Sequence, residues 1–219
     1  METRTIGEAS ILLPDLDPED LDEVTGEPDG ELVEAFVDGA SWTGLQLSGD
    51  RVSQSRLVGV DLSDAVWRNV IVYGSRFERV DFSSARLLGV TIERCEFVGC
   101  RMTGVNLAKA TLKNVVFTDC RLDYATITET RTTGAVGLAG CNLTNAALTR
   151  CELTKAVLAE CRLTELELDT CDLHGADLRG NELSGILGLR SLQGATIGED
   201  QLPSLAMIAA RELELDVRS

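Results

Sequence analysis

The chain of 219 residues carries a formal net charge of −16, with 44% hydrophobic but only 4% aromatic residues. It contains neither an apolar run of the 18 or more residues that span a membrane nor a basic segment followed by an apolar one, as in a secretory signal. We therefore expect a cytoplasmic protein without a membrane span, and the acidic balance excludes a basic groove that binds nucleic acid directly.

Residues 1–31 follow no regular period and contain Pro14, Pro18 and Pro28. Residues 1–37 hold 12 acids and one base, so most of the negative charge lies here. This composition predicts a largely disordered acidic arm. We expect the apolar run 11–13 to pack on the first coil of the following repeat and cover its open edge. The arm is interpreted either as a partner-binding tail or as a solvated leader with a small cap.

From Val37 to Ile127 an apolar residue stands at every fifth position, in 19 of 19 places. Neither a helix, with its period of 3.6 residues, nor a strand, with its period of 2, explains this spacing. The residue two places earlier is nearly always small, and the other three are mostly polar. Each unit therefore supplies one large inward residue, called a plug below, and one small inward residue. A fixed period of this kind indicates a repeat architecture.

The period is interrupted twice farther along the chain. Ile127 and Leu138 are 11 residues apart, which predicts a one-residue insertion near residues 128–137, interpreted as a bulge or corner loop. From Leu138 to Leu183, all ten plugs are leucine. The spacing then shortens by one residue, and Leu187, Leu192 and Ile197 are the last candidate plugs.

Units such as Ala-Asp-Leu-Arg-Gly (176–180), Val-Asp-Leu-Ser-Asp (60–64) and Cys-Asn-Leu-Thr-Asn (141–145) show the pattern clearly. This pattern resembles the pentapeptide repeat family. The resemblance implies an all-β fold, a right-handed quadrilateral β-helix with four units per 20-residue coil, over residues 32–198. The sequence supports this coil length, because Phe77, Phe97 and Phe117 are 20 residues apart and would stack on one face at the strand spacing of about 4.8 Å.

Residues 199–219 predict a short C-terminal α-helix with Pro203 in its first turn. One apolar stripe is expected to cap the last coil and a second to stay exposed, which predicts an isologous homodimer. The resemblance likewise implies end-to-end dimers formed by this helix. The first stripe comprises Leu202, Leu205, Ala206, Ala209 and Leu213, and the second Met207, Ile208 and Ala210. The predicted dimer interface comprises Leu205, Met207, Ile208 and Leu213.

No arrangement of residues predicts catalysis, a cofactor or a metal site. The only histidine, His174, follows an inward leucine and is expected to face water. All seven cysteines occupy the small inward position, where we expect reduced core thiols, and their spacing is not that of a zinc site. The chain is therefore not expected to be an enzyme.

Function is expected to come from the outer surface. The resemblance implies a DNA mimic that binds DNA gyrase or topoisomerase IV and protects it from quinolones or natural poisons. Residues 38–131 hold 11 acids and 12 bases, whereas residues 132–219 hold 13 acids and seven bases, so an acidic face is predicted near the C-terminal dimer contact. Its residues are Glu165, Glu167, Asp169, Asp172, Asp177 and Glu182.

The alternative is a protein-interaction or regulatory scaffold whose partner is not a topoisomerase. It would use the less acidic half of the repeat, where charged residues recur every 20 residues and form a ladder. This ladder comprises Asp61, Asp81, Arg101 and Arg121. Ladders of this kind also stabilise neighbouring coils, so the pattern alone does not decide between the two roles.

Overall fold

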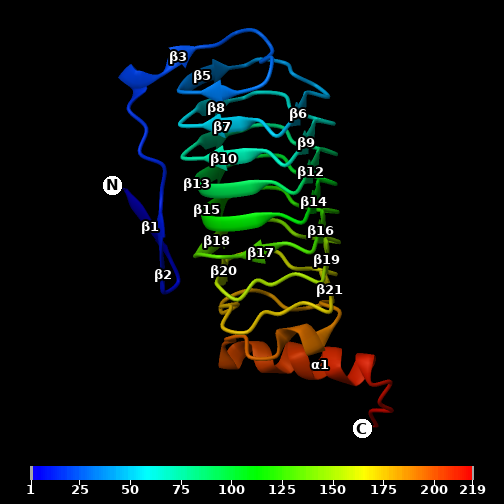
Figure 1. Cartoon of the computed structure of the whole chain (residues 1–219). Helices are drawn as coiled ribbons and strands as arrows, with labels where there is room; N and C mark the ends of the chain where they lie inside the picture. The colour runs from blue at the N-terminus through cyan, green and yellow to red at the C-terminus, as the bar shows by residue number, and fades with distance from the viewer. Residues whose placement is uncertain (1, 219) are drawn as a thin grey trace.

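The computed structural model describes residues 2–218 and shows a parallel β-solenoid with a single α-helix at its C-terminal end (Figure 1). Neighbouring strands lie in parallel register with a step of 20 residues, as in the pairing of Arg86 with Asn106. Four five-residue units therefore make one coil with four sides. The right-handed quadrilateral β-helix predicted from the sequence is confirmed.

Three sides of the coil are built from short strands, and the fourth from turns joined by isolated bridges. Side A contains β5 (Ala35–Asp38), β8 (Arg56–Val58), β11 (Arg76–Glu78), β18 (Val136–Ala139) and β20 (Ala156–Ala159), with the second halves of β13 (Thr91–Val98) and β15 (Thr111–Thr118). Side B is the column of bridges that runs from Ser41 to Glu182.

Side C is a seven-stranded sheet made of β6 (Gln46–Ser48), β9 (Val66–Arg68), β12 (Arg86–Leu88), β14 (Asn106–Ala108), β16 (Thr126–Thr128), β19 (Ala147–Thr149) and β21 (Glu167–Asp169). Side D contains β4 (Leu32–Val33), β7 (Arg51–Ser53), β10 (Ile71–Tyr73), the first halves of β13 and β15, and β17 (Arg131–Thr132). Because β13 and β15 each continue around a corner, sides A and D belong to one sheet.

The interior is a shaft filled by the plugs and by the small residues between them. The predicted phenylalanine column is present on side A. The ring centroids of Phe77 and Phe97 are 4.7 Å apart and those of Phe97 and Phe117 are 4.8 Å apart, with nearly parallel planes. All seven cysteines are buried and free, each in the predicted small position.

The coil length changes at two places. Leu112 pairs with Thr132, a step of 20, but Val115 pairs with Val136, a step of 21. The extra residue therefore lies between β17 and β18, inside the range predicted for the insertion. Near the end, Asp177 bridges Thr196, a step of 19. Leu187, predicted as a plug, lies on the outside as the bridge partner of Glu167, and buried Ile186 fills the core there instead.

The prediction of a largely disordered N-terminal arm is wrong. β1 (Thr3–Ile6) and β2 (Ala9–Leu12) form an antiparallel hairpin that lies against the flank of the solenoid (Figure 1). Ile11 and Leu13 are buried, but against side A near Val116 and Val157 rather than on the first coil. The first coil is covered by β3 (Asp22–Glu23), which follows η1 (Pro18–Asp20) and pairs with β5.

The C-terminal end is closed by α1 (Leu202–Glu212), which follows η2 (Leu189–Leu192) and η3 (Glu199–Gln201). Ile208 is 3% exposed and packs into the main core together with half-buried Leu205. The carboxylate of Glu212 accepts hydrogen bonds from the backbone N–H groups of Gly188 and Leu189 and so fastens the helix to the preceding turn.

Candidate protein-interaction surface

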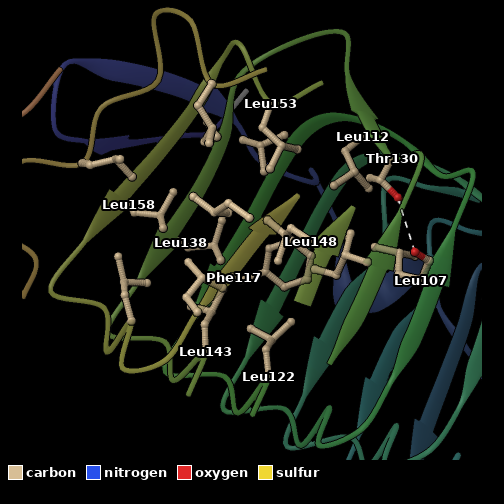
Figure 2. Close-up of a pocket in the computed structure, with 18 of the residues that line it drawn as sticks. Leu107, Leu112, Phe117, Leu122, Thr130, Leu138, Leu143, Leu148, Leu153 and Leu158 are labelled. Carbon is tan, nitrogen blue, oxygen red and sulfur yellow. Dashed lines mark hydrogen bonds between the residues drawn. The ribbon is translucent and has the colours of Figure 1, made fainter. Parts of the chain in front are cut away.

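The interior offers no polar site. Figure 2 shows leucine side chains from Leu107 to Leu158 around a narrow cavity of about 80 Å³. The one labelled polar side chain, Thr130, donates a hydrogen bond to the carbonyl of Leu107 at 3.5 Å. Burial raises the pKa of the Cys95 thiol to about 12, which keeps it protonated and unreactive. Within residues 2–218, no group of three or more His, Cys, Asp or Glu residues is arranged to hold a metal ion.

The six acids predicted to form one outer face lie on all four sides of the last coils. Glu167 and Asp169 flank the plug of β21 on side C, and Glu165 lies at the corner before it. The others follow at quarter turns around the coil. Asp172 bridges Glu152 on side D, Asp177 bridges Val157 on side A, and Glu182 bridges Arg162 on side B. The prediction that these acids form a single face is therefore wrong.

With exposed Glu160, these acids instead form a ring around the solenoid, called the acidic belt below. Its members are Glu160, Glu165, Glu167, Asp169, Asp172, Asp177 and Glu182. Residues 158–187 contain these seven acids and two bases, Arg162 and Arg179, which gives a net charge of −5. The belt is thus the most concentrated negative region of the repeat.

The members of the belt differ in whether their carboxylates already form ion pairs or hydrogen bonds within the chain. Hydrogen bonds from the Arg179 side chain lower the pKa of Asp177, and Arg179 also contacts Glu8 at 2.8 Å. Asp172 accepts a hydrogen bond from the backbone N–H of His174. In the part of the chain that the structure describes, Glu165, Glu167 and Asp169 form no ion pair. Side C therefore carries the acids that are freest to meet a cationic partner.

The charge ladder on side B is present where it was predicted. Asp61, Asp81, Arg101 and Arg121 are joined by successive bridges. Arg101 contacts Asp81 at 2.9 Å, and hydrogen bonds from the Ser63 hydroxyl and backbone lower the pKa of Asp61. The two acids and the two bases cancel over the ladder as a whole, and the Asp81–Arg101 ion pair joins them, so this column projects no field of one sign.

The predicted dimer residues on α1 are only partly exposed. Met207 and Leu213 are 75% and 68% exposed, and Leu202, the first residue of the helix, is 55% exposed. Ile208, predicted to face a second copy, is instead buried against the last coil, and Leu205 is packed beside it. The two stripes were divided wrongly, because the helix turns its Leu205–Ile208 side toward the core. Leu202, Met207 and Leu213 remain exposed on the outer side of the helix. These three residues are called the open helix face below.

The repeat pattern is matched by two models of one family. A model described as "pentapeptide repeat region" matches residues 70–135, and a model described as "pentapeptide repeats (8 copies)" matches residues 138–185. The chain belongs to the pentapeptide repeat family.

Solved structures of several pentapeptide repeat proteins are similar to this chain. A trypsin-treated variant of QnrB1, described as a plasmid-mediated fluoroquinolone resistance protein, is 15% identical, with 90% of this chain and 96% of that chain covered and a TM-score of 0.49. HetL, described as involved in heterocyst differentiation regulation in the cyanobacterium Nostoc sp. strain PCC 7120, is 22% identical, with 77% and 90% covered and a TM-score of 0.29. No curated protein matches this pentapeptide repeat protein.

No helix among residues 2–218 is both long enough and apolar enough to cross a membrane. Among the described residues of this pentapeptide repeat protein, the acidic belt and the open helix face are the candidate surfaces for a partner. Both lie at the C-terminal end of the solenoid.

Proposed function

We propose that this chain forms a homodimer through the open helix face and that the two acidic belts, brought together at the centre of the dimer, bind a protein with a cationic DNA-binding groove. The partner class that fits is a type II topoisomerase such as DNA gyrase. In this role the chain occupies the DNA groove without chemistry of its own, and it modulates the enzyme or protects it from quinolone-like poisons.

The observation that carries this proposal is the charge density of the belt next to an unpartnered apolar helix face. Residues 158–187 make one and a half coils, which rise about 7 Å at the strand spacing of about 4.8 Å. Duplex DNA carries about one charge per 1.7 Å, or about four over this length. The belt, with a net charge of −5, therefore matches the linear charge density of a duplex.

The upper coils favour a second candidate function for a different reason. Residues 38–131 have 11 acids and 12 bases, so this half does not resemble a duplex in charge. A near-neutral wall with internally balanced ladders is suited to an interaction scaffold whose partner is not a topoisomerase. The two candidates place the decisive contacts in different halves of the solenoid and are separable by charge reversal.

The experiment compares two triple charge reversals with the same net change of +6. Glu165→Lys, Glu167→Lys and Asp169→Lys alter side C of the belt, whereas Glu34→Lys, Asp38→Lys and Asp64→Lys alter exposed acids in the upper coils. We expect the purified chain to inhibit gyrase supercoiling, or to protect gyrase from a fluoroquinolone. The belt reversal should abolish this effect and the upper reversal should leave it. No effect of the unaltered chain at tens of micromolar would contradict the proposal.

The dimer contact has its own measurement. Met207→Glu places a charge on the open helix face without touching the cap, because Met207 is 75% exposed. The expected result is a monomer by sedimentation equilibrium, whereas the unaltered chain sediments as a dimer. If the unaltered chain is monomeric at all concentrations, the proposal that two acidic belts meet at the centre of a dimer is wrong.

A further inference from the structure

A second small core lies outside the solenoid, between the N-terminal hairpin and side A. It is formed by Ile6, Ile11 and Leu13 of the hairpin and its following residue, packed on Val116 and Val157 of the wall. Ala135, Ala139 and Ala159 border this core. The function proposed above makes no use of this contact, which lies on a different side from the unpaired acids of the belt.

The wall under the hairpin differs from the rest of its own column. The outer position before each plug on side A holds Phe36 in the first coil, Arg56, Arg76 and Glu96 in the next three coils, and Asp177 in the last one. In the three coils between them the same position holds Val116, Gly137 and Val157. Side A thus carries an apolar strip three coils long, with a charged residue at its upper end and another at its lower end. The strip comprises Val116, Ala135, Gly137, Ala139, Val157 and Ala159.

The hairpin complements this strip in shape. Gly137 provides the necessary room, since a Cβ atom added there would lie 2.5 Å from Ile6 Cδ1 and 2.7 Å from Ile11 Cδ1. At the hairpin turn, Gly7 has a φ of +55°, and a Cβ atom there would lie 3.0 Å from Val157 Cγ1. Small residues on both partners therefore let the two backbones approach closely.

The charges at the two ends are also complementary. Arg4 Nη1 lies 2.7 Å from Glu96 Oε1, a carboxylate that is almost fully buried, and donates a hydrogen bond to Thr118 Oγ1 at 2.9 Å. At the other end, Glu8 Oε1 lies 2.8 Å from Arg179 Nη2. A ligand of this strip is therefore specified by an apolar face with a cation toward the upper coils and an anion toward the lower coils.

The hairpin is held by side chains rather than by the sheet. Among residues 2–218, β1 pairs only with β2, and neither strand joins a strand of the solenoid. An isolated two-stranded hairpin is marginally stable at best in water, so this hairpin keeps its shape only while it is docked. A linker that contains Pro14 and η1 connects it to the first coil, and Figure 1 shows that linker running along the flank.

We propose that the side A strip is a binding site for an amphipathic β-hairpin, and that the N-terminal hairpin is its displaceable ligand in cis. While the hairpin is docked, its tether gives it an effective concentration in the millimolar range, which excludes a competing hairpin of moderate affinity. Once it is released, the strip accepts a hairpin of the same chemistry from another molecule. The N-terminal segment thus acts as an autoinhibitory cover over a second interaction surface.

The test uses the full chain and a labelled peptide of residues 2–17 as the probe. Ile11→Asp releases the hairpin in cis but leaves the strip unaltered, because Ile11 contributes nothing to the solenoid core. By fluorescence anisotropy, the Ile11→Asp chain should bind the unaltered peptide saturably. The unaltered chain should bind it at least about 100-fold more weakly, as the tethered hairpin competes at millimolar effective concentration.

A second substitution in the Ile11→Asp chain locates the site. Adding Gly137→Val should weaken peptide binding at least about tenfold, because the new side chain overlaps the position of Ile6 and Ile11 and overpacking is unfavourable. Adding Ala147→Val is the matched control, since Ala147 occupies the same outer position of the same coil on side C. This control should leave peptide binding unchanged.

Two results would overturn the proposal. One is an Ile11→Asp chain that keeps its β-helix circular dichroism and fails to bind the peptide. The other is equal binding with and without Gly137→Val, which would place the peptide elsewhere. If Ile11→Asp unfolds the chain, Arg4→Glu replaces it, because it releases the hairpin by charge repulsion from Glu96 with the same readouts. Neither result depends on whether the chain binds gyrase.

Discussion

The upper half of the solenoid, residues 32–127, and the lower half, residues 138–192, use the same repeat but fill it differently. The upper half mixes tryptophan, phenylalanine, valine and leucine plugs, and the cavity near Trp42 and Trp67 is about 10 Å³. The lower half uses leucine almost throughout, and a cavity of about 80 Å³ runs along its shaft and continues up to Met102 in the upper half. Identical plugs keep the period regular, but side chains of one size cannot interlock, so gaps remain along the shaft.

The outer walls of the two halves differ as well. The upper half carries the eight-residue strands β13 and β15 and has balanced charges, whereas in the last coils strands give way to isolated bridges and the belt is strongly acidic. The tightly packed half therefore provides a rigid template, and the half that meets a partner under the proposed function is the more loosely packed one. Three pairs of substitutions, one member in each half, test this division.

The largest effect is expected from removing a plug in the phenylalanine column. Phe97→Ala deletes a ring that stacks on both Phe77 and Phe117 and should cost about 3–5 kcal/mol of the free energy of unfolding. Leu158→Ala, in the same column beside the larger cavity, should cost only about 2 kcal/mol, at the low end for such deletions. Chemical denaturation followed by circular dichroism measures both, and equal losses would contradict the difference in packing.

A smaller effect, of opposite sign in the two halves, is expected from lengthening the same column. Leu138→Phe adds a fourth ring under Phe117 and fills part of the lower cavity, so it should stabilise the chain by about 0.5–1.5 kcal/mol. Leu57→Phe adds a ring above Phe77, where Leu57 is 1% exposed and tightly packed, and should destabilise by about 1–3 kcal/mol. Chemical denaturation measures both: the midpoint should rise for Leu138→Phe and fall for Leu57→Phe, and shifts of the same sign would contradict the difference in cavity volume.

The smallest effect concerns the corners, where the chain adopts positive φ. Thr170 has a φ of +55°, a conformation that costs a β-branched residue about 1–2 kcal/mol, so Thr170→Gly should raise stability by about 0.5 kcal/mol after the entropy of glycine is subtracted. Asn69, at an equivalent corner with a φ of +53°, tolerates this conformation. Asn69→Gly should therefore leave the melting temperature unchanged, and a matching rise in both variants would argue against relief of strain at Thr170.

The features that follow from the repeat were predictable from the sequence. The plug positions up to Leu183, the phenylalanine column and the buried cysteines all follow from a period of five and a coil of 20. The same arithmetic explains why the acidic face was wrong: Asp172, Asp177 and Glu182 are five residues apart, and each step of five is a quarter turn around the coil. Residues share a side only within one unit or at a spacing of 20.

Two other features depend on contacts that no period records. The hairpin packs on Val116 and Val157, more than 100 residues away, and its only sequence signals are the short run around Ile11 and the lone Arg4 in an acidic segment. The orientation of α1 about its axis is set by how Ile208 fits the last coil, and both of its stripes are apolar enough to serve. Periodicity locates such segments without fixing the surface on which they lie.

The position of the hairpin has a consequence for how the chain matures on the ribosome. Residues 3–13 emerge early, but the wall that receives them is complete only after Arg179 has been made. At about 5–20 residues per second, translation leaves the segment waiting on the order of ten seconds or more. During that interval its isoleucines and leucines are open to chaperones or to neighbouring nascent chains, and its closure onto side A marks the end of assembly rather than the beginning.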